Sequence, residues 1–60
     1  MNRSEALKRC YELALKIAQT GVGGKNSSEL DDLSRMYGIF IIYTDAGIIV
    51  EDRMVRYSFR

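Results

Sequence analysis

Residues 38–50 constrain the fold more than any other stretch, because they predict a β-hairpin. Two runs rich in isoleucine, valine and aromatic side chains flank the connection Asp45–Gly47. Gly47 suits the left-handed last position of a three-residue hairpin loop. The part of the chain before this hairpin has helical periodicity, and the part after it again resembles a strand.

The loop length decides which side chains of the hairpin share a face. A three-residue loop places Thr44 opposite Ile48 and Ile42 opposite Val50. Side chains alternate between the two faces of a strand, so this pairing predicts a core face and an outer face. The predicted core face consists of Phe40, Ile42, Ile48 and Val50, and the predicted outer face of Ile39, Ile41, Tyr43 and Ile49.

Residues 51–60 allow two interpretations. They extend the second strand into a long hairpin, or they turn at Asp52-Arg53 and return as a third strand with Val50 opposite Val55. The second interpretation separates polar from apolar side chains better, because it adds Val55, Tyr57 and Phe59 to the core face. We therefore favour a three-stranded meander, although Asp-Arg lacks the glycine that tight hairpin turns prefer.

A first helix is predicted over residues 3–20. Asn2 and Glu5 have the spacing of a capping box, and Ser4 competes as the N-cap. Gly21 suits the C-terminal cap. Apolar residues recur at steps of three and four and define a buried stripe, which consists of Leu7, Cys10, Tyr11, Ala14, Ile17 and Ala18.

A second helix is predicted over about residues 28–37, after a glycine-rich loop. Asn26 or Ser28 would be its N-cap, and Gly38 stands where a left-handed C-terminal cap is expected. Its predicted buried stripe consists of Leu30, Leu33, Met36 and Tyr37. The fold class is therefore α+β, a single domain over residues 1–60 with two helices packed on one face of a small antiparallel sheet, in the order α-α-β-β-β.

Length and composition limit what can stabilise this domain. A chain of 60 residues with one cysteine and no histidine cannot form an internal disulfide or a zinc site from its own side chains. Domains of this size are marginally stable alone, so we expect a homodimer slightly more often than a monomer. No apolar run approaches the length of a membrane span, and the residues after Met1 do not resemble a signal peptide, so we expect a cytoplasmic protein.

No group of residues predicts catalysis. Residues 21–27 lack the first glycine and the final Ser or Thr of a phosphate-binding loop, and they follow a helix instead of a strand. Asp31 and Asp32 are adjacent on a helix and point in different directions. Cys10 has no histidine to activate it. We therefore expect neither an enzyme nor a bound cofactor or metal.

Two features predict binding to a macromolecule. The first is the predicted outer face of the sheet, whose apolar side chains would form a protein interface consisting of Ile39, Ile41, Tyr43, Ile49 and Met54. The second is the basic and aromatic C-terminal segment, where Arg53, Arg56 and Arg60 alternate with aromatic residues and could contact single-stranded nucleic acid. The net charge of +1 gives no overall attraction to nucleic acid.

We favour the first feature. The sequence then predicts a small regulator or inhibitor that binds another protein through the outer sheet face and an exposed edge strand, as small proteins of phages and mobile elements often do. The alternative is a small nucleic-acid-binding dimer that uses the basic C-terminal strand.

Overall fold

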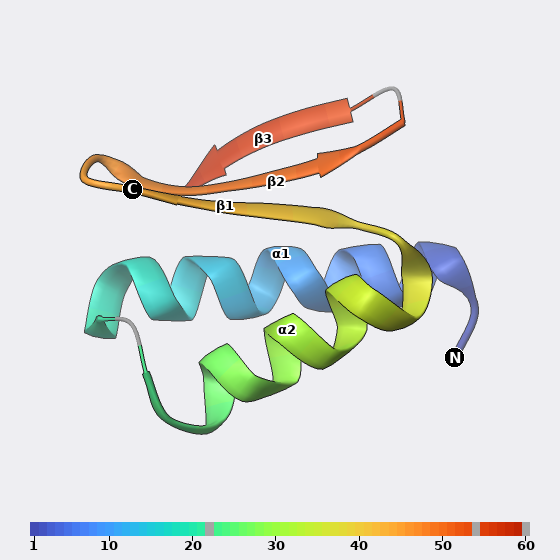
Figure 1. The fold of residues 1–60 in the computed structure, drawn as a ribbon, viewed down its shortest axis with the longest axis horizontal. Helices are drawn as coiled ribbons and strands as arrows, with labels where there is room; N and C mark the ends of the chain where they lie inside the picture. Colours follow the sequence, from blue (N-terminus) through green and yellow to red (C-terminus); the bar gives the residue numbers. More distant parts are fainter. Residues whose placement is uncertain (22, 54, 60) are drawn as a thin grey trace.

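A computed structural model of the chain contains two helices followed by a three-stranded antiparallel sheet (Figure 1). The structure describes residues 1–21, 23–53 and 55–59, with Val55 described by its backbone alone. The elements in chain order are α1 (Arg3–Thr20), α2 (Gly24–Tyr37), β1 (Phe40–Thr44), β2 (Gly47–Asp52) and β3 (Val55–Phe59). The predicted α+β fold class is confirmed.

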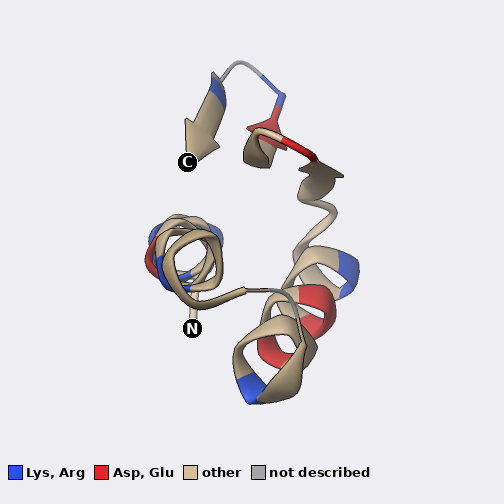
Figure 2. Ribbon diagram, turned by 90° about the vertical axis from the view of Figure 1, so that its left-hand side faces the viewer, with Lys and Arg blue, Asp and Glu red and all other residues tan. Residues whose placement is uncertain are grey.

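The sheet has the strand order β1-β2-β3 with antiparallel neighbours, so residues 55–59 form a third strand and do not extend the second. Both helices lie on one side of this sheet, as the two views show (Figures 1 and 2). α1 packs against α2, β2 and β3, whereas α2 contacts α1 and β1. Within the described residues, no helix lies over the other side of the sheet.

α1 has the predicted bounds because its cap residues act as expected. The Asn2 side chain accepts a hydrogen bond from the Glu5 N–H at 2.9 Å, which satisfies one of the free donors of the first turn. At the other end, the Gly21 N–H donates to the Ile17 carbonyl at 2.7 Å. Gly21 has a φ of 100°, a backbone conformation that favours glycine.

α2 begins at Gly24, four residues before the predicted start, so neither Asn26 nor Ser28 is its N-cap. The N-cap is Gly23, whose N–H donates to the Ser27 hydroxyl at 2.8 Å. Gly23 and Gly24, which are predicted in the glycine-rich loop, are instead the N-cap and the first residue of α2. The predicted end is confirmed, because Gly38 has the left-handed φ of 66° and ψ of 37° and its N–H bonds to the Ser34 carbonyl.

The first hairpin has a two-residue loop instead of the predicted three-residue loop. Gly47 pairs with Thr44 as the first residue of β2, and the register continues with Tyr43 opposite Ile48 and Ile42 opposite Ile49. This shift of one residue reverses the faces of β1. The predicted core positions Phe40 and Ile42 are 69% and 40% exposed, so the predicted face of this strand is wrong.

The physical reason for the observed register is visible at both ends of β1. Ile39, just before the strand, is buried in the core at 3% exposure. At the other end, Thr44 points away from the helices, where its hydroxyl donates to the Gly47 carbonyl at 2.9 Å. The predicted register would have turned this threonine toward the apolar interior. Gly47 has a φ of 146°, so glycine is still required at this position, although not in the left-handed helical conformation.

The pairing of β2 with β3 also differs from its prediction, but this difference does not move side chains to the other face of the sheet. Val50 pairs with Tyr57, and Asp52 with Val55, two residues beyond the predicted pairing of Val50 with Val55. A shift of two residues keeps each side chain on the same side of the sheet. Tyr57 and Phe59 therefore lie on the side of Val50, as predicted; the predicted place of the Val55 side chain lies outside the described residues.

The hydrophobic core fills the space between the helices and the sheet. Its buried members include Cys10 on the predicted stripe of α1. Met36, predicted in the stripe of α2, is instead 70% exposed. The buried apolar side chains are Ala6, Cys10, Leu13, Ala14, Ile17, Leu30, Leu33, Ile39, Ile48 and Val50.

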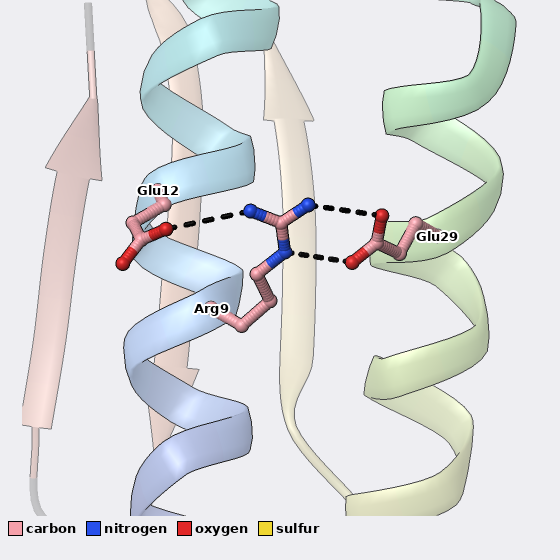
Figure 3. A network of polar contacts seen from close by, with 3 residues as sticks. All are labelled: Arg9, Glu12 and Glu29. Carbon is pink, nitrogen blue, oxygen red and sulfur yellow. Dashed lines mark hydrogen bonds and ion pairs between the residues drawn. The ribbon is translucent and has the colours of Figure 1, made fainter.

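Polar contacts join the helices on the surface. Arg9 of α1 binds Glu29 of α2 through two hydrogen bonds, from Nε at 2.7 Å and from Nη2 at 3.1 Å (Figure 3). Arg9 also contacts Glu12 at 3.4 Å. The two bonds hold the pKa of the Glu29 carboxyl below its ordinary value. Glu29 is therefore part of the contact between the helices.

Candidate protein-binding surface

The side of the sheet away from the helices is the candidate binding surface. The register places Phe40, Glu51 and Arg56 in one row across the three strands, and Ile42, Ile49 and Ser58 in the next. We use the name outer face for the side chains of these two rows together with Thr44, which stands beside the turn. The outer face thus consists of Phe40, Ile42, Thr44, Ile49, Glu51, Arg56 and Ser58.

Apolar side chains occupy one half of the outer face and polar side chains the other. Phe40 is 69% exposed and Ile42 40% exposed, and Ile49, the direct neighbour of Ile42, is half-buried. Glu51 stands directly opposite Arg56 on the adjacent strand. Opposite charges at this position balance each other, so the face carries no net charge. It is an apolar patch with a neutral polar border.

Three of the five residues predicted as an interface lie elsewhere. Ile39 is buried in the core, Ile41 is partly buried against it, and Tyr43 is on the same side of the sheet as both. Ile49 alone among the described ones belongs to the outer face. The fifth, Met54, lies outside the described residues.

Tyr43 connects the sheet to α2. Its hydroxyl donates to the Asp31 carboxylate at 3.2 Å, although its side chain remains 41% exposed. Partial burial, and after it the nearby Asp31 charge, raises the pKa of Tyr43. Tyr43 thus stays a neutral donor at physiological pH and holds β1 over the second helix.

The basic C-terminal segment does not combine its charges and aromatic rings on one surface. Arg56 belongs to the outer face, whereas Tyr57 and Phe59 point toward α1. There they contact Tyr11, at ring-centroid distances of 4.9 Å for Tyr57 and 5.7 Å for Phe59. Arg53 is exposed in the turn before β3. The third predicted arginine, Arg60, lies outside the described residues.

The chemically reactive groups are separated from one another. Cys10 is a free, fully buried thiol, and its burial, with a smaller effect of Glu29, raises the pKa of the thiol. Asp31 and Asp32 each contact a different residue, Tyr43 and Arg35. Within residues 1–21, 23–53 and 55–59, no group of three potential metal-ligating His, Cys, Asp or Glu side chains comes together.

A hollow of about 230 Å³ lies between the end of α1 and the turn from β1 to β2. Binding sites for small molecules typically measure about 300–1,000 Å³ and bring several polar groups together. This hollow is smaller and mostly apolar. It is lined by Ile17, Ala18, Gly21, Tyr43, Thr44, Asp45, Ala46, Gly47 and Ile48.

Sequence reasoning missed Phe40 and Ile42 as surface residues. Residues 39–43 are all apolar or aromatic, so alternation alone does not distinguish the two faces of β1. The available signal was Thr44, whose polar side chain favours the face away from the core. That position puts Phe40 and Ile42 on the exposed side with it.

Comparison of the chain with protein-family models, with curated proteins and with solved structures returns no match. Within the described residues, neither helix has a segment long and apolar enough to cross a membrane.

Proposed function

We propose that this chain is a non-enzymatic domain that binds another protein through the outer face of its sheet and acts as a regulator or inhibitor. The observation that carries the proposal is the exposure of Phe40 and Ile42 beside Ile49, on the one sheet face without a helix over it. Contiguous exposed apolar side chains on a small domain are typical of interaction surfaces.

The composition of the face favours a protein partner. An aromatic and two aliphatic anchors with a polar border resemble the apolar centre and polar rim of protein interfaces. Nucleic acid would require several unpaired positive charges along one surface. On the outer face Arg56 has the carboxylate of Glu51 directly opposite.

The state of Cys10, the single cysteine of the chain, favours binding without catalysis. The thiol of Cys10 is buried and its pKa is raised, which favours the unreactive protonated form. A free cysteine is also compatible with a reducing compartment such as the cytoplasm, which we propose as the location.

A capture experiment with matched variants tests the proposal. Ile49→Glu places a charge in the middle of the outer face, whereas Leu15→Glu places the same charge on α1, where Leu15 is 44% exposed. The wild type and both variants are immobilised and exposed to extract from the source cells, after circular dichroism has shown that they are folded. We expect proteins retained by the wild type and by Leu15→Glu to be lost from Ile49→Glu.

Two outcomes would contradict the proposal. Retention of the same proteins by both variants would show that the outer face is not used. Retention of nucleic acid that decreases steeply with salt, and that Arg56→Glu abolishes, would support the basic strand instead.

A further inference from the structure

We propose that a second copy of this chain binds along β1, so that the two β1 strands pair antiparallel around a two-fold axis. This pairing would join two three-stranded sheets into one continuous sheet. It goes beyond the proposed function, because it uses the edge of the sheet and leaves the outer face available for a different protein.

The first observation is that β1 is an edge strand without the usual protection. Natural edge strands carry charged residues, proline or a bulge that prevents pairing with another chain. β1 consists of Phe-Ile-Ile-Tyr-Thr, all residues with high β-propensity and none charged, and four of its five residues are exposed. β1 contains no charged residue, whereas the other edge strand, β3, carries Arg56.

The second observation is that β1 is complementary to itself. When two copies overlap along all five residues, Ile42 lies on the two-fold axis opposite Ile42 of the second copy. Phe40 then faces Thr44, and Ile41 faces Tyr43. Each of these two pairs joins an aromatic to a β-branched side chain, a combination that stabilises neighbouring strands.

The same register keeps the faces of the two sheets continuous. Residues with even numbers in β1 belong to the outer face in both copies, and Ile41 and Tyr43 point toward the helices in both. The core side of each sheet therefore stays over its own helices. The exposed Phe40 and Ile42 side chains of the two copies would form one larger apolar patch.

The paired strands carry no charge that opposes the pairing. The charged side chains of the outer face, Glu51 and Arg56, are on β2 and β3, so they lie away from the axis in the joined sheet. On the helix side, Tyr43 donates a hydrogen bond to Asp31 of its own copy. The two β1 strands meet without a pair of like charges.

The test compares two lysine substitutions at directly paired positions of the outer face. Ile42→Lys places two lysines opposite each other on the axis, whereas Ile49→Lys adds the same charge one strand away. Solution mass is measured by sedimentation equilibrium, with circular dichroism to verify folding. We expect a dimer for the wild type, a dimer of similar affinity for Ile49→Lys, and a dimer at least about tenfold weaker for Ile42→Lys.

Disulfide cross-linking tests the β1 pairing independently, and the cysteine substitutions change the side chain less than lysine does. Antiparallel neighbours have Cα atoms about 4.5–5.5 Å apart, within the range that a disulfide spans. Under mild oxidation Ile42→Cys is expected to form covalent dimers rapidly and Ile49→Cys slowly or not at all. Cys10 is buried and does not compete.

Three results would overturn the pairing. A wild type that remains monomeric at high concentration excludes it. Equal loss of the dimer in both lysine variants would indicate packing of one outer face on another instead of edge pairing. Equal cross-linking at positions 42 and 49 would exclude the axis at Ile42. Loss of the dimer would leave the capture experiment at Ile49 unaffected, so the two proposals fail separately.

Discussion

At the scale of single residues, Arg3 joins parts of the chain that are far apart in sequence. Its guanidinium donates to the Tyr37 carbonyl at the end of α2 and forms an ion pair with Asp52 at the end of β2. The Tyr37 hydroxyl in turn donates to the Met1 carbonyl at 2.7 Å. The start of α1 is thereby held against both the second helix and the sheet.

The Arg3–Asp52 contact predicts a dependence of stability on pH. The hydrogen bond from Arg3, and after it the Arg53 backbone N–H, lowers the pKa of the Asp52 carboxyl. Because the folded pKa lies below the unfolded value of about 3.9, the contact stabilises the fold at neutral pH. That contribution is lost as the pH falls through the lowered folded pKa. Urea unfolding at neutral and at acidic pH measures the loss.

Arg3→Met is the variant that isolates this contact. It keeps much of the side-chain length but removes the hydrogen bonds, so we expect a smaller difference in unfolding free energy between neutral and acidic pH than in the wild type. Glu29, whose pKa is lowered mainly by its hydrogen bond with Arg9, contributes with the same sign, and Arg9→Met serves as the parallel control. An unchanged pH dependence in Arg3→Met would mean that Asp52 does not contribute.

At the scale of elements, β3 is held to α1 mainly by aromatic contacts. Tyr11 meets Tyr57 edge to face at an interplanar angle of 68°, and it also packs against Phe59. Aromatic pairs contribute about 0.5–1.5 kcal/mol each beyond the area they bury. These contacts hold an edge strand that has a hydrogen-bonded neighbour on one side within the described sheet.

Removal of the Tyr11 ring is therefore expected to loosen β3 selectively. We expect Tyr11→Ala to lower the free energy of unfolding by about 1–3 kcal/mol, and Tyr11→Phe, which keeps the ring, by much less. Amide hydrogen exchange should become faster in β3 than in β1. A uniform increase over all three strands would contradict this assignment.

The elements differ in how well the sequence predicts them, and the reasons are physical. α1 was predicted with its bounds because Asn2 and Gly21 are strong local cap signals that nothing else in the fold opposes. The start of α2 was missed because Gly23 and Gly24 are poor helix formers. In the structure, the Ser27 hydroxyl compensates by binding the Gly23 N–H.

In the hairpin of β1 and β2, by contrast, the local sequence signals are ambiguous. β1 is apolar on both faces, so its register depends on one residue of loop length. The polar Thr44 favours the observed register, and two tertiary contacts add to it, namely the burial of Ile39 and the contact of Tyr43 with Asp31. Local patterns do not contain these contacts, and the predicted interface therefore fell on the wrong side of β1.

At the scale of the whole molecule, one core lies between two helices and a three-stranded sheet, and the second sheet face remains without a helix. The fold class followed from the order of periodic segments, because few arrangements bury the apolar faces of two helices and a meander. The candidate binding surface did not follow in the same way, because it depends on which apolar residues the core leaves exposed. On the outer face, Phe40 and Ile42 are the apolar residues that stay most exposed.

The most direct measurement for the central claim, that the outer face binds a protein, is photo-cross-linking in the source cells. A photoreactive amino acid replaces Phe40, which is 69% exposed on the outer face, or Leu15, which is 44% exposed on α1. We predict discrete products from position 40, heavier than two copies of this chain, that position 15 does not form. Products of equal yield from both positions, or none beyond this chain itself from position 40, would contradict the claim.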